Sequence, residues 1–348
     1  MVKRLLLLNL VWSVMAFVPV EERLSERSKT INKAFQLGNS DWVSVNNAFG
    51  QIHVTTWDES TVEVEVEITV ESRYDNRLEE MLENISVDFQ ERSDGVFMRS
   101  NTDLNTRNNE KFEINYTIKI PPDNPLEVKN SYGDIYLDDR SGEVDVNLSY
   151  GDLKAGKLIK GGELKLSFGK GDVQAFGPGR IELKYMKFFS LDEAQSLELD
   201  QQYSELEIQK VNAIDMRSRY GQAEFGTVGE MDVNVHFTDF TIESLEKSLD
   251  MLAKYATDFS LDHVSQDFEF IDIEGNYGSY NIDLEEGLKA DFKGDFKYAS
   301  MRALGVDIDY SIRIEEQGKE SYEAKIGGGH PSKRIHIAST YGDLRLTQ

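Results

Sequence analysis

A short signature, an aromatic residue followed by Gly and Asp, recurs along this chain of 348 residues at nearly constant spacing. Complete copies stand at Tyr132-Gly133-Asp134, Tyr150-Gly151-Asp152 and Tyr341-Gly342-Asp343. Aromatic anchor positions fall at Tyr132, Tyr150, Phe168, Tyr185, Tyr203, Tyr220, Phe237, Tyr255, Tyr277 and Tyr298. The first eight are 17 or 18 residues apart. A fixed period of this size predicts stacked supersecondary units, one for each repeat.

Each repeat contains two short strands. Apolar residues alternate before the anchor, as at Val146 and Leu148, and resume three and five positions after it, as at Ile135 and Leu137 after Tyr132. This period of two indicates strands with one buried face. We expect the phase to break at the Gly-Asp pair, because Gly tolerates the positive φ of a bulge. The alternation therefore predicts that each aromatic ring ends the first strand and faces the core, stacked on the rings of neighbouring coils.

Two strands and two turns in about 18 residues cannot bury a face alone, but parallel stacking of coils about 4.8 Å apart gives a continuous apolar interior. The predicted fold is therefore all-β: a right-handed parallel β-solenoid with about 17–18 residues per coil and a hairpin-rich N-terminal cap. The stretch 243–256 has leucines at helical spacing. We interpret it as a coil, because Leu249, Met251, Ala253 and Tyr255 keep the strand phase.

The N-terminus has the parts of a secretory signal. Lys3-Arg4 precede an apolar run from Leu5 to Val18, and charged residues follow. The run is short for a membrane span, although an uncleaved N-terminal anchor is the alternative. We divide the chain into a signal peptide at 1–18, a linker or first strand at 19–40, an N-terminal β cap with the first coil at 41–125, and solenoid repeats at 126–348 with a C-terminal hairpin near 306–328.

Composition restricts the chemistry and the partners. The chain has no Cys, which excludes disulfides, thiolate metal sites, Cys nucleophiles and a lipidated Cys. The formal net charge of −25 argues against nucleic acid or anionic lipid as a direct partner. We expect an exported protein, periplasmic or at the cell surface, without an integral membrane segment in the mature chain.

Carboxylates recur two positions after several anchors. They stand at Asp134, Asp152, Glu205, Asp239 and Asp343. Stacked carboxylates can share a hard cation such as Ca²⁺. Asp residues also cap turns, and we favour that interpretation because other residue types interrupt the row.

No catalytic constellation is evident. Asp172 near Lys170 and Lys187 is the nearest match to an enzyme acting on acidic polysaccharides, and we interpret it as solvated surface. The five His residues share no metal-ligand spacing. The segment 327–333 is rich in Gly but lacks the Gly-Lys-Ser/Thr ending of a phosphate loop, so we expect a flexible connection into the last coil. We therefore predict no catalytic, cofactor-binding or metal-binding residues, and no cofactor.

The segment Ile118-Lys119-Ile120-Pro121-Pro122, followed by residues 128–135 and by repeated Gly-Asp-Ile or Gly-Asp-Leu, resembles the bacterial family of secreted β-solenoids known as "putative adhesins". The resemblance covers about residues 40–348. It implies tandem short-strand coils behind a signal peptide and, by analogy, surface interaction. The weak Gly-Asp copies between Phe168 and Tyr203 depart from the pattern.

These observations favour a non-catalytic binding or structural module of the cell envelope, adhesin-like, which uses a repetitive solenoid face. An envelope protein or glycan is the expected partner. The alternatives are a polysaccharide-active enzyme of the parallel β-helix type and an envelope-stress accessory protein. A binding module should lack a deep cleft and repeat one class of residue along an exposed face.

Overall fold

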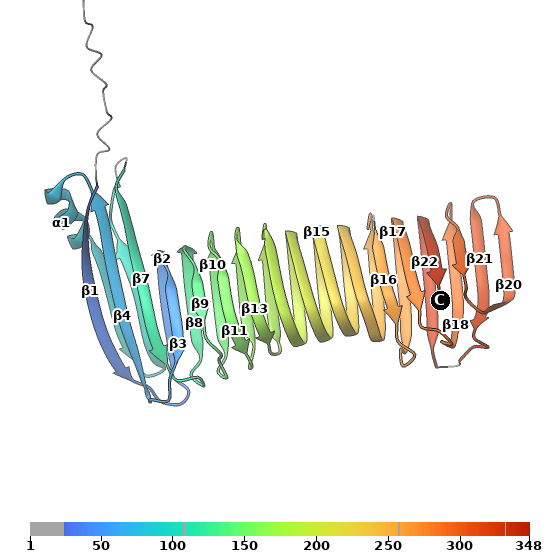
Figure 1. Cartoon of the computed structure of the whole chain (residues 1–348), viewed down its shortest axis with the longest axis horizontal. Coiled ribbons are helices and arrows are strands. Elements are labelled where there is room, and N and C mark those ends of the chain that lie inside the picture. The colour runs from blue at the N-terminus through green and yellow to red at the C-terminus, as the bar shows by residue number, and fades with distance from the viewer. Residues whose placement is uncertain (1–23, 107–108, 257, 331) are drawn as a thin grey trace, which may run out of the picture.

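The computed structural model describes residues 24–106, 109–256, 258–330 and 332–348. The signal peptide predicted at 1–18 lies outside the described residues. The chain forms an elongated stack of β coils, with the N-terminal segments at one end and the strands after residue 290 at the other (Figure 1). The predicted β-solenoid is confirmed.

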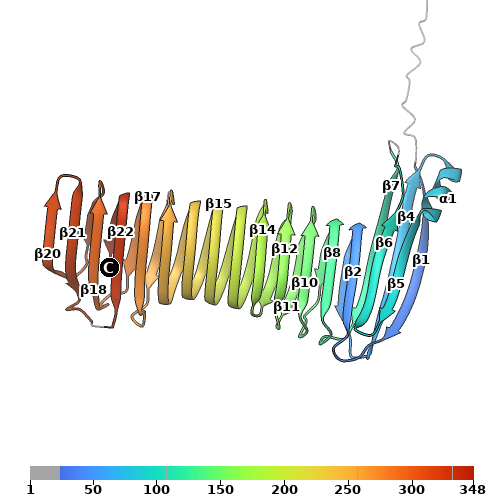
Figure 2. The same cartoon turned by 180° about the vertical axis from the view of Figure 1, so that it is seen from behind.

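Each coil contributes one strand to each of two faces. Face I carries the strands that precede the anchors, and face II carries the strands that follow them. Figure 2 shows part of face I, with β8, β10, β12 and β14 side by side. The first strands of face I are β8 (Leu126–Tyr132), β10 (Val144–Ser149), β12 (Gly162–Ser167) and β14 (Gly179–Lys184). Those of face II are β9 (Ile135–Leu137), β11 (Leu153–Leu158) and β13 (Lys170–Phe176).

The coils pair in parallel at the period of the sequence. Val144 pairs with Gly162 and Gly162 with Gly179, which are steps of 18 and 17 residues. The long strand β15 (Phe188–Lys254) winds on through several coils, starting beside β13 and β14. It ends beside β16 (Phe259–Val264) and β17 (Phe270–Leu284). The stretch 243–256, with its leucines at helical spacing, is thus strand up to Lys254, as predicted.

The core between the two faces is filled by the alternating apolar residues. Val144, Val146 and Leu148 are at most 2% exposed, and the equivalent residues of other coils join the same apolar cluster. The anchor rings do not join it: from Tyr132 onward they are 42–67% exposed. The prediction that these rings face the core was wrong.

The backbone at the anchors explains this error. From Tyr150 onward, ten anchors have a left-handed backbone with φ between 51° and 59°. This conformation turns the ring outward and directs the next residue inward, so Met186 and Thr238 are buried. The phase therefore breaks at the aromatic residue itself. Only after Tyr132 and after Phe49, which occupies the anchor position of the coil before it, does the Gly carry the positive φ, at Gly133 and Gly50.

In the later coils, the Gly after the anchor is required for space and not for a positive φ. A Cβ at Gly151 would lie 2.2 Å from the carbonyl oxygen of Gly133, and one at Gly169 would lie 1.9 Å from that of Gly151. Real Cβ atoms do not approach a carbonyl this closely. Gly is therefore required here by the close approach of successive coils.

The N-terminal cap covers the open edges of both faces with antiparallel pairs. On face II, β1 (Ser25–Gln36), β4 (Thr61–Ser72) and β7 (Lys111–Ile120) pair in that order, and β7 then runs parallel to β3 (Ile52–Thr56). On face I, the hairpin of β5 (Ile85–Arg92) and β6 (Gly95–Thr102) adjoins β2 (Trp42–Phe49), the neighbour of β8. The helix α1 (Asp75–Glu83), which we did not predict, connects β4 to β5.

The C-terminal end departs from sequence order. The chain forms a coil from β18 (Ala290–Lys297) and β19 (Met301–Leu304), then an antiparallel hairpin of β20 (Ile308–Glu316) and β21 (Lys319–Ile326). The last strand, β22 (Arg334–Thr347), returns to lie between β17 and β18. The last coil along the chain is therefore not the last in space, and β21 and β20 cover β18 instead.

Candidate functional site

The anchor rings form one continuous stack, which we call the aromatic ladder. In spatial order it consists of Phe49, Tyr132, Tyr150, Phe168, Tyr185, Tyr203, Tyr220, Phe237, Tyr255, Tyr277, Tyr341 and Tyr298. Neighbouring ring centroids are 4.6–5.4 Å apart and the ring planes differ by 2–13°. Stacking of the rings was predicted correctly, but the stack lies on the outer corner between faces I and II.

The ladder exposes ring edges and hydroxyls. Each inner ring has a neighbour over both of its faces, so the solvent-exposed part of the ring is its edge. Nine of the twelve rings are Tyr, and none of their hydroxyls makes a hydrogen bond to another group in the described part of the chain. The result is a row of free hydroxyl donors and acceptors, one coil apart or, across Phe168 and Phe237, two coils apart.

The ladder adds little to the stability of the fold. A left-handed backbone costs a residue with a side chain about 1–2 kcal/mol. A stacked aromatic pair contributes about 0.5–1.5 kcal/mol beyond the area it buries. These terms nearly cancel, and Gly would adopt the same backbone without strain. Repeated backbone strain under exposed rings therefore suggests a surface that contacts something.

The Asp row beside the ladder caps backbone groups. Asp134 Oδ1 accepts a hydrogen bond from the backbone N–H of Asp152 at 2.9 Å, and Asp152 Oδ1 accepts one from Lys170 at 2.8 Å. Asp343 Oδ1 does the same for Ser300 at 2.7 Å. Capping was the favoured interpretation, although the capped N–H belongs to the adjacent coil and not to the same turn. Within residues 24–348, apart from the four undescribed positions, no cluster of three or more His, Asp or Glu could hold a metal ion.

The residues considered for polysaccharide chemistry do not converge. Lys170 and Lys187 stand at the corner, where the backbone N–H of Lys187 binds the carbonyl of Gly169. Asp172 lies along β13 and pairs with Ser190. In the described chain, no ion pair joins Asp172 to either lysine. The three residues therefore form no acid–base set.

The His residues are dispersed, each with its own surroundings. His53 stacks on Tyr136 with ring centroids 4.3 Å apart, and His336 Nδ1 lies 3.0 Å from Asp272 Oδ1. His263 faces Glu285 at 3.7 Å. Gly327, Gly328 and Gly329 lie between β21 and β22 and have positive φ angles; the flexibility expected of this connection stays a prediction.

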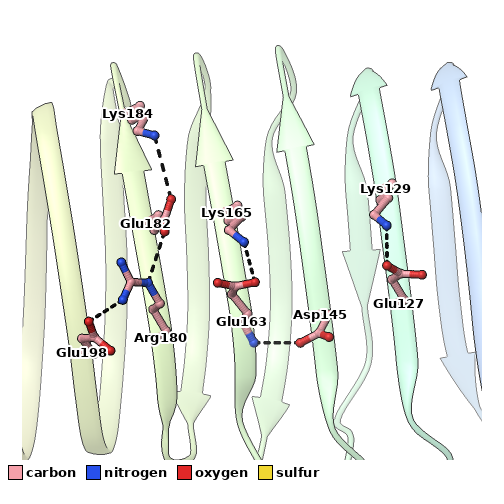
Figure 3. Close-up of polar contacts among 9 residues, drawn as sticks. All are labelled: Glu127, Lys129, Asp145, Glu163, Lys165, Arg180, Glu182, Lys184 and Glu198. Atoms are coloured by element: carbon pink, nitrogen blue, oxygen red, sulfur yellow. Dashed lines mark hydrogen bonds and ion pairs between the residues drawn. The ribbon is translucent and has the colours of Figure 1, made fainter.

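Charged side chains on the first coils of face I are paired with one another (Figure 3). Lys129 contacts Glu127 at 2.5 Å and Lys165 contacts Glu163 at 2.6 Å, each pair two residues apart on one strand. Arg180 bridges Glu182, at 3.2 Å, and Glu198 in the next coil. Lys184 lies 3.9 Å from Glu182. Cations in this part of face I thus have their charge balanced within the protein.

The later coils of face I carry cations without such partners. Arg219, His236 and Lys254 directly precede the ladder rings Tyr220, Phe237 and Tyr255. Among the described residues, neither Arg219 nor Lys254 has a carboxylate within ion-pair distance. Burial lowers the pKa of His236, and the charges of Lys254 and Arg219 lower it further. Our sequence analysis missed this column, although its position one residue before successive anchors was visible.

A column of carboxylates runs farther from the ladder on the same face. Asp232, Asp250 and Asp272 occupy equivalent positions in successive coils. Burial raises the pKa of Asp250, and the neighbouring charges of Asp232 and Asp272 raise it further. Face I therefore changes, across its width, from an acidic column to a basic column and then to the aromatic ladder.

Several solved structures resemble the chain at low identity. A "putative cell adhesion protein" from Clostridium sporogenes is 12% identical, with coverage of 92% of this chain and 100% of that one, and a TM-score of 0.24. A "putative adhesin" from Bacteroides fragilis is 10% identical, with coverage of 91% and 97% and a TM-score of 0.34. A "putative lipid binding protein" from Parabacteroides distasonis is 11% identical, with coverage of 92% and 97% and a TM-score of 0.31. These likenesses are too distant to support an argument about function.

None of the curated proteins matches the sequence. Within the part of the chain that the structure describes, no helix has the length and apolar character needed to cross a membrane. One family model does match, over residues 43–347, which is most of the chain and includes every ring of the aromatic ladder. The protein therefore belongs to the Toastrack family DUF4097.

Proposed function

We propose that this protein is a non-catalytic, adhesin-like binding module of the cell envelope, and that the aromatic ladder is its contact surface. The protein is exported, and it acts in the periplasm or at the cell surface. Its partner is an envelope glycan or protein that lies along the outer corner of the solenoid.

The observation that carries this proposal is the row of exposed tyrosines. Nine hydroxyls face solvent on one corner, and no described residue of the protein binds them. A group that recurs in most coils offers many weak contacts to an extended partner, and such contacts add up through effective concentration. The rigid parallel stack fixes the spacing of the hydroxyls before the partner binds, which reduces the entropy lost on binding.

The stacking of the rings restricts the kind of contact that the ladder can make. Sugars and bases commonly pack on the open face of an aromatic ring, as stacking platforms for single-stranded nucleic acids do. Here the neighbouring rings cover those faces at 4.6–5.4 Å. Binding must therefore use hydrogen bonds to the hydroxyls and contacts with the ring edges.

The proposal is tested by sedimentation of the purified protein with cell-envelope fractions. We expect the unmodified protein to sediment with them and the triple variant Tyr203→Phe, Tyr220→Phe, Tyr255→Phe to bind at least about tenfold more weakly. The variant keeps the stacked rings and loses three hydroxyls, each worth about 0.5–1.5 kcal/mol in a hydrogen bond.

The control is Tyr136→Phe, which removes a hydroxyl from face II that already binds Asp134. This variant should sediment like the unmodified protein. Failure of the unmodified protein to sediment, or equal sedimentation of the triple variant, would contradict the proposal. Release of soluble product from the envelope polymer would contradict its non-catalytic part.

A further inference from the structure

We propose that Arg219 and Lys254, with the hydroxyls of Tyr220 and Tyr255, form a binding site for the carboxylate groups of a linear acidic glycan that lies along the aromatic ladder. This inference rests on the function proposed above and adds the chemical class of the ligand.

The four groups lie within three successive coils. Tyr220 stacks on Phe237 with centroids 5.0 Å apart, and Phe237 stacks on Tyr255 at 4.7 Å. The residue before each ring shares this alignment, so His236 lies between Arg219 and Lys254. The charges of both cations lower the pKa of His236, after burial, which agrees with this alignment. The two cations are therefore about two coil spacings apart, on one side of a row of hydroxyls.

The two cations are available to a ligand. Both side chains are exposed, and neither has an ion-pair partner among the described residues. The cations of earlier coils differ, because Lys129, Lys165 and Arg180 each contact a carboxylate. Arg219 and Lys254 thus hold uncompensated positive charge in a protein whose formal net charge is −25.

The acidic residues nearby do not cancel this local charge. In the adjoining coils, Asp200 and Glu274 each stand two residues before the counterpart of Arg219 or Lys254, and neither is within ion-pair distance of that cation. On the strands of the two cations themselves, Asp215 and Asp250 stand four residues before Arg219 and Lys254, which is about 13 Å along a strand. The Debye length at physiological ionic strength is about 8 Å, so exposed charges at that distance are largely screened. Across the ladder, Gln222 stands nearest to Tyr220, and Asp239, which follows Phe237, already has a partner.

The chemistry of the surface favours an acidic glycan over other anions. Nucleic acid carries a dense line of phosphates, about one charge per 1.7 Å of duplex, which two cations about two coil spacings apart cannot match. Its bases would also find no open ring face. A peptide could not add as a strand here, because strands on both sides already pair with their neighbours. A glycan offers sparse carboxylates for the cations and hydroxyls for the tyrosines.

The experiment measures binding of the intact protein to three polymers of similar length by fluorescence anisotropy. The probes are oligogalacturonate, a neutral glucan and single-stranded DNA. We expect oligogalacturonate to bind and the other two to bind at least tenfold more weakly. Binding of oligogalacturonate should weaken as salt rises, because the contacts are exposed ion pairs.

The test variant is Arg219→Gln with Lys254→Gln, and the matched control is Lys129→Gln with Lys165→Gln. Both double variants remove two cations from face I and change the net charge equally. Only the test variant should lose at least tenfold in affinity for oligogalacturonate. Thermal unfolding of both variants reports whether the fold is intact, and Arg219→Lys should restore part of the binding.

Equal loss in both double variants, or equal binding of the neutral glucan or the DNA, would overturn this inference. Its failure can be told from failure of the proposed function. If sedimentation with the envelope requires the tyrosine hydroxyls but not Arg219 and Lys254, the acidic-glycan site alone is contradicted. If the unmodified protein does not sediment with the envelope, both proposals are contradicted.

Discussion

The N-terminal cap and the regular coils both bury an apolar core between two layers of strands, but they are built from opposite pairings. In the cap, β1, β4 and β7 pair antiparallel, and among its described residues only Asn109, in a turn, combines a side chain with positive φ. In the coils the strands pair in parallel, and ten aromatic residues adopt that backbone. Strain is thus concentrated in the repeated part of the molecule, under its exposed rings.

Polar contacts differ between the two regions in the same way. The cap contains a buried ion pair, in which Arg77 Nε lies 3.0 Å from Glu110 Oε1 and both side chains are at most 8% exposed. Arg77 also contacts Glu80 at 2.7 Å and donates to the carbonyl of Asn105 at 2.9 Å. The described coils contain no buried ion pair; they bury neutral groups such as Gln201 and Ser218, which hydrogen-bond to each other, and they repeat a small contact, the Asp that caps the next coil. Loss of the buried Arg77 charge should therefore damage the cap more than loss of one capping Asp damages the coils.

The largest effect is expected for Arg77→Met. This variant removes the Arg77 guanidinium from the buried Glu110, and breaking a buried pair in this way costs about 3–5 kcal/mol. Urea unfolding should show this loss of stability. The matched control is Arg27→Met, which removes the exposed contact of Arg27 with Glu79 and should cost less than about 1 kcal/mol. Equal losses of stability in the two variants would contradict the importance of the buried Arg77–Glu110 pair for the cap.

A smaller effect should report backbone strain in the coils. Tyr203 has φ of 52°, so Tyr203→Gly should be about 1 kcal/mol more stable than Tyr203→Ala. In an ordinary strand Ala is the more stable residue, by about 0.5–1 kcal/mol. That ordinary order is expected at Tyr132, where Gly133 carries the positive φ. Chemical denaturation of the four variants would give the order at each position, and the same order at both would contradict our description of the ladder.

The smallest effect concerns the acidic column of face I. Because the pKa of Asp250 is raised in the folded protein, folding favours its protonated form, and its charged form opposes folding. The favourable contribution is present below the ordinary carboxyl pKa and is lost as the pH rises through the folded value. Asp250→Asn should therefore stabilise the protein at pH 7, by less than about 1 kcal/mol, and this gain should shrink on acidification.

Thermal unfolding at several pH values would measure this gain. Asp94→Asn, in the turn between β5 and β6, is the control for loss of one negative charge at an exposed site of the cap. A gain from Asp250→Asn that did not depend on pH would show that neither the burial of the Asp250 charge nor its repulsion by Asp232 and Asp272 is the cause.

Much of the fold could be predicted because the repeat fixes it. The period gave the pairing of Val144 with Gly162, and the alternation identified the buried residues of each coil. The direction of the rings could not be read from alternation, because a left-handed Tyr150 reverses the phase one residue earlier than Gly151 would. The position of β22 between β17 and β18 could not be predicted either. Every coil presents the same strand edges, so the repeat does not indicate which coils β22 pairs with.

The candidate site could also be predicted only in part from the sequence. The ladder rings and the column of Arg219, His236 and Lys254 both follow from the period. Whether a cation is paired does not, because it depends on side-chain geometry: Arg180 reaches Glu198 in the next coil, whereas Arg219 reaches no carboxylate in the described chain. The exposure of eight of the nine ladder tyrosines likewise depended on the left-handed backbone at the anchor itself, and that of Tyr132 on the backbone next to Gly133.

Nitration of tyrosines, mapped by mass spectrometry with and without bound oligogalacturonate, tests the outward-facing ladder most directly. Tyr116 and Tyr280 are fully buried and serve as internal controls. We predict that the ladder tyrosines react, that Tyr116 and Tyr280 do not, and that the glycan protects Tyr220 and Tyr255 more than Tyr132. Ladder tyrosines that resist nitration as the buried controls do would contradict the account.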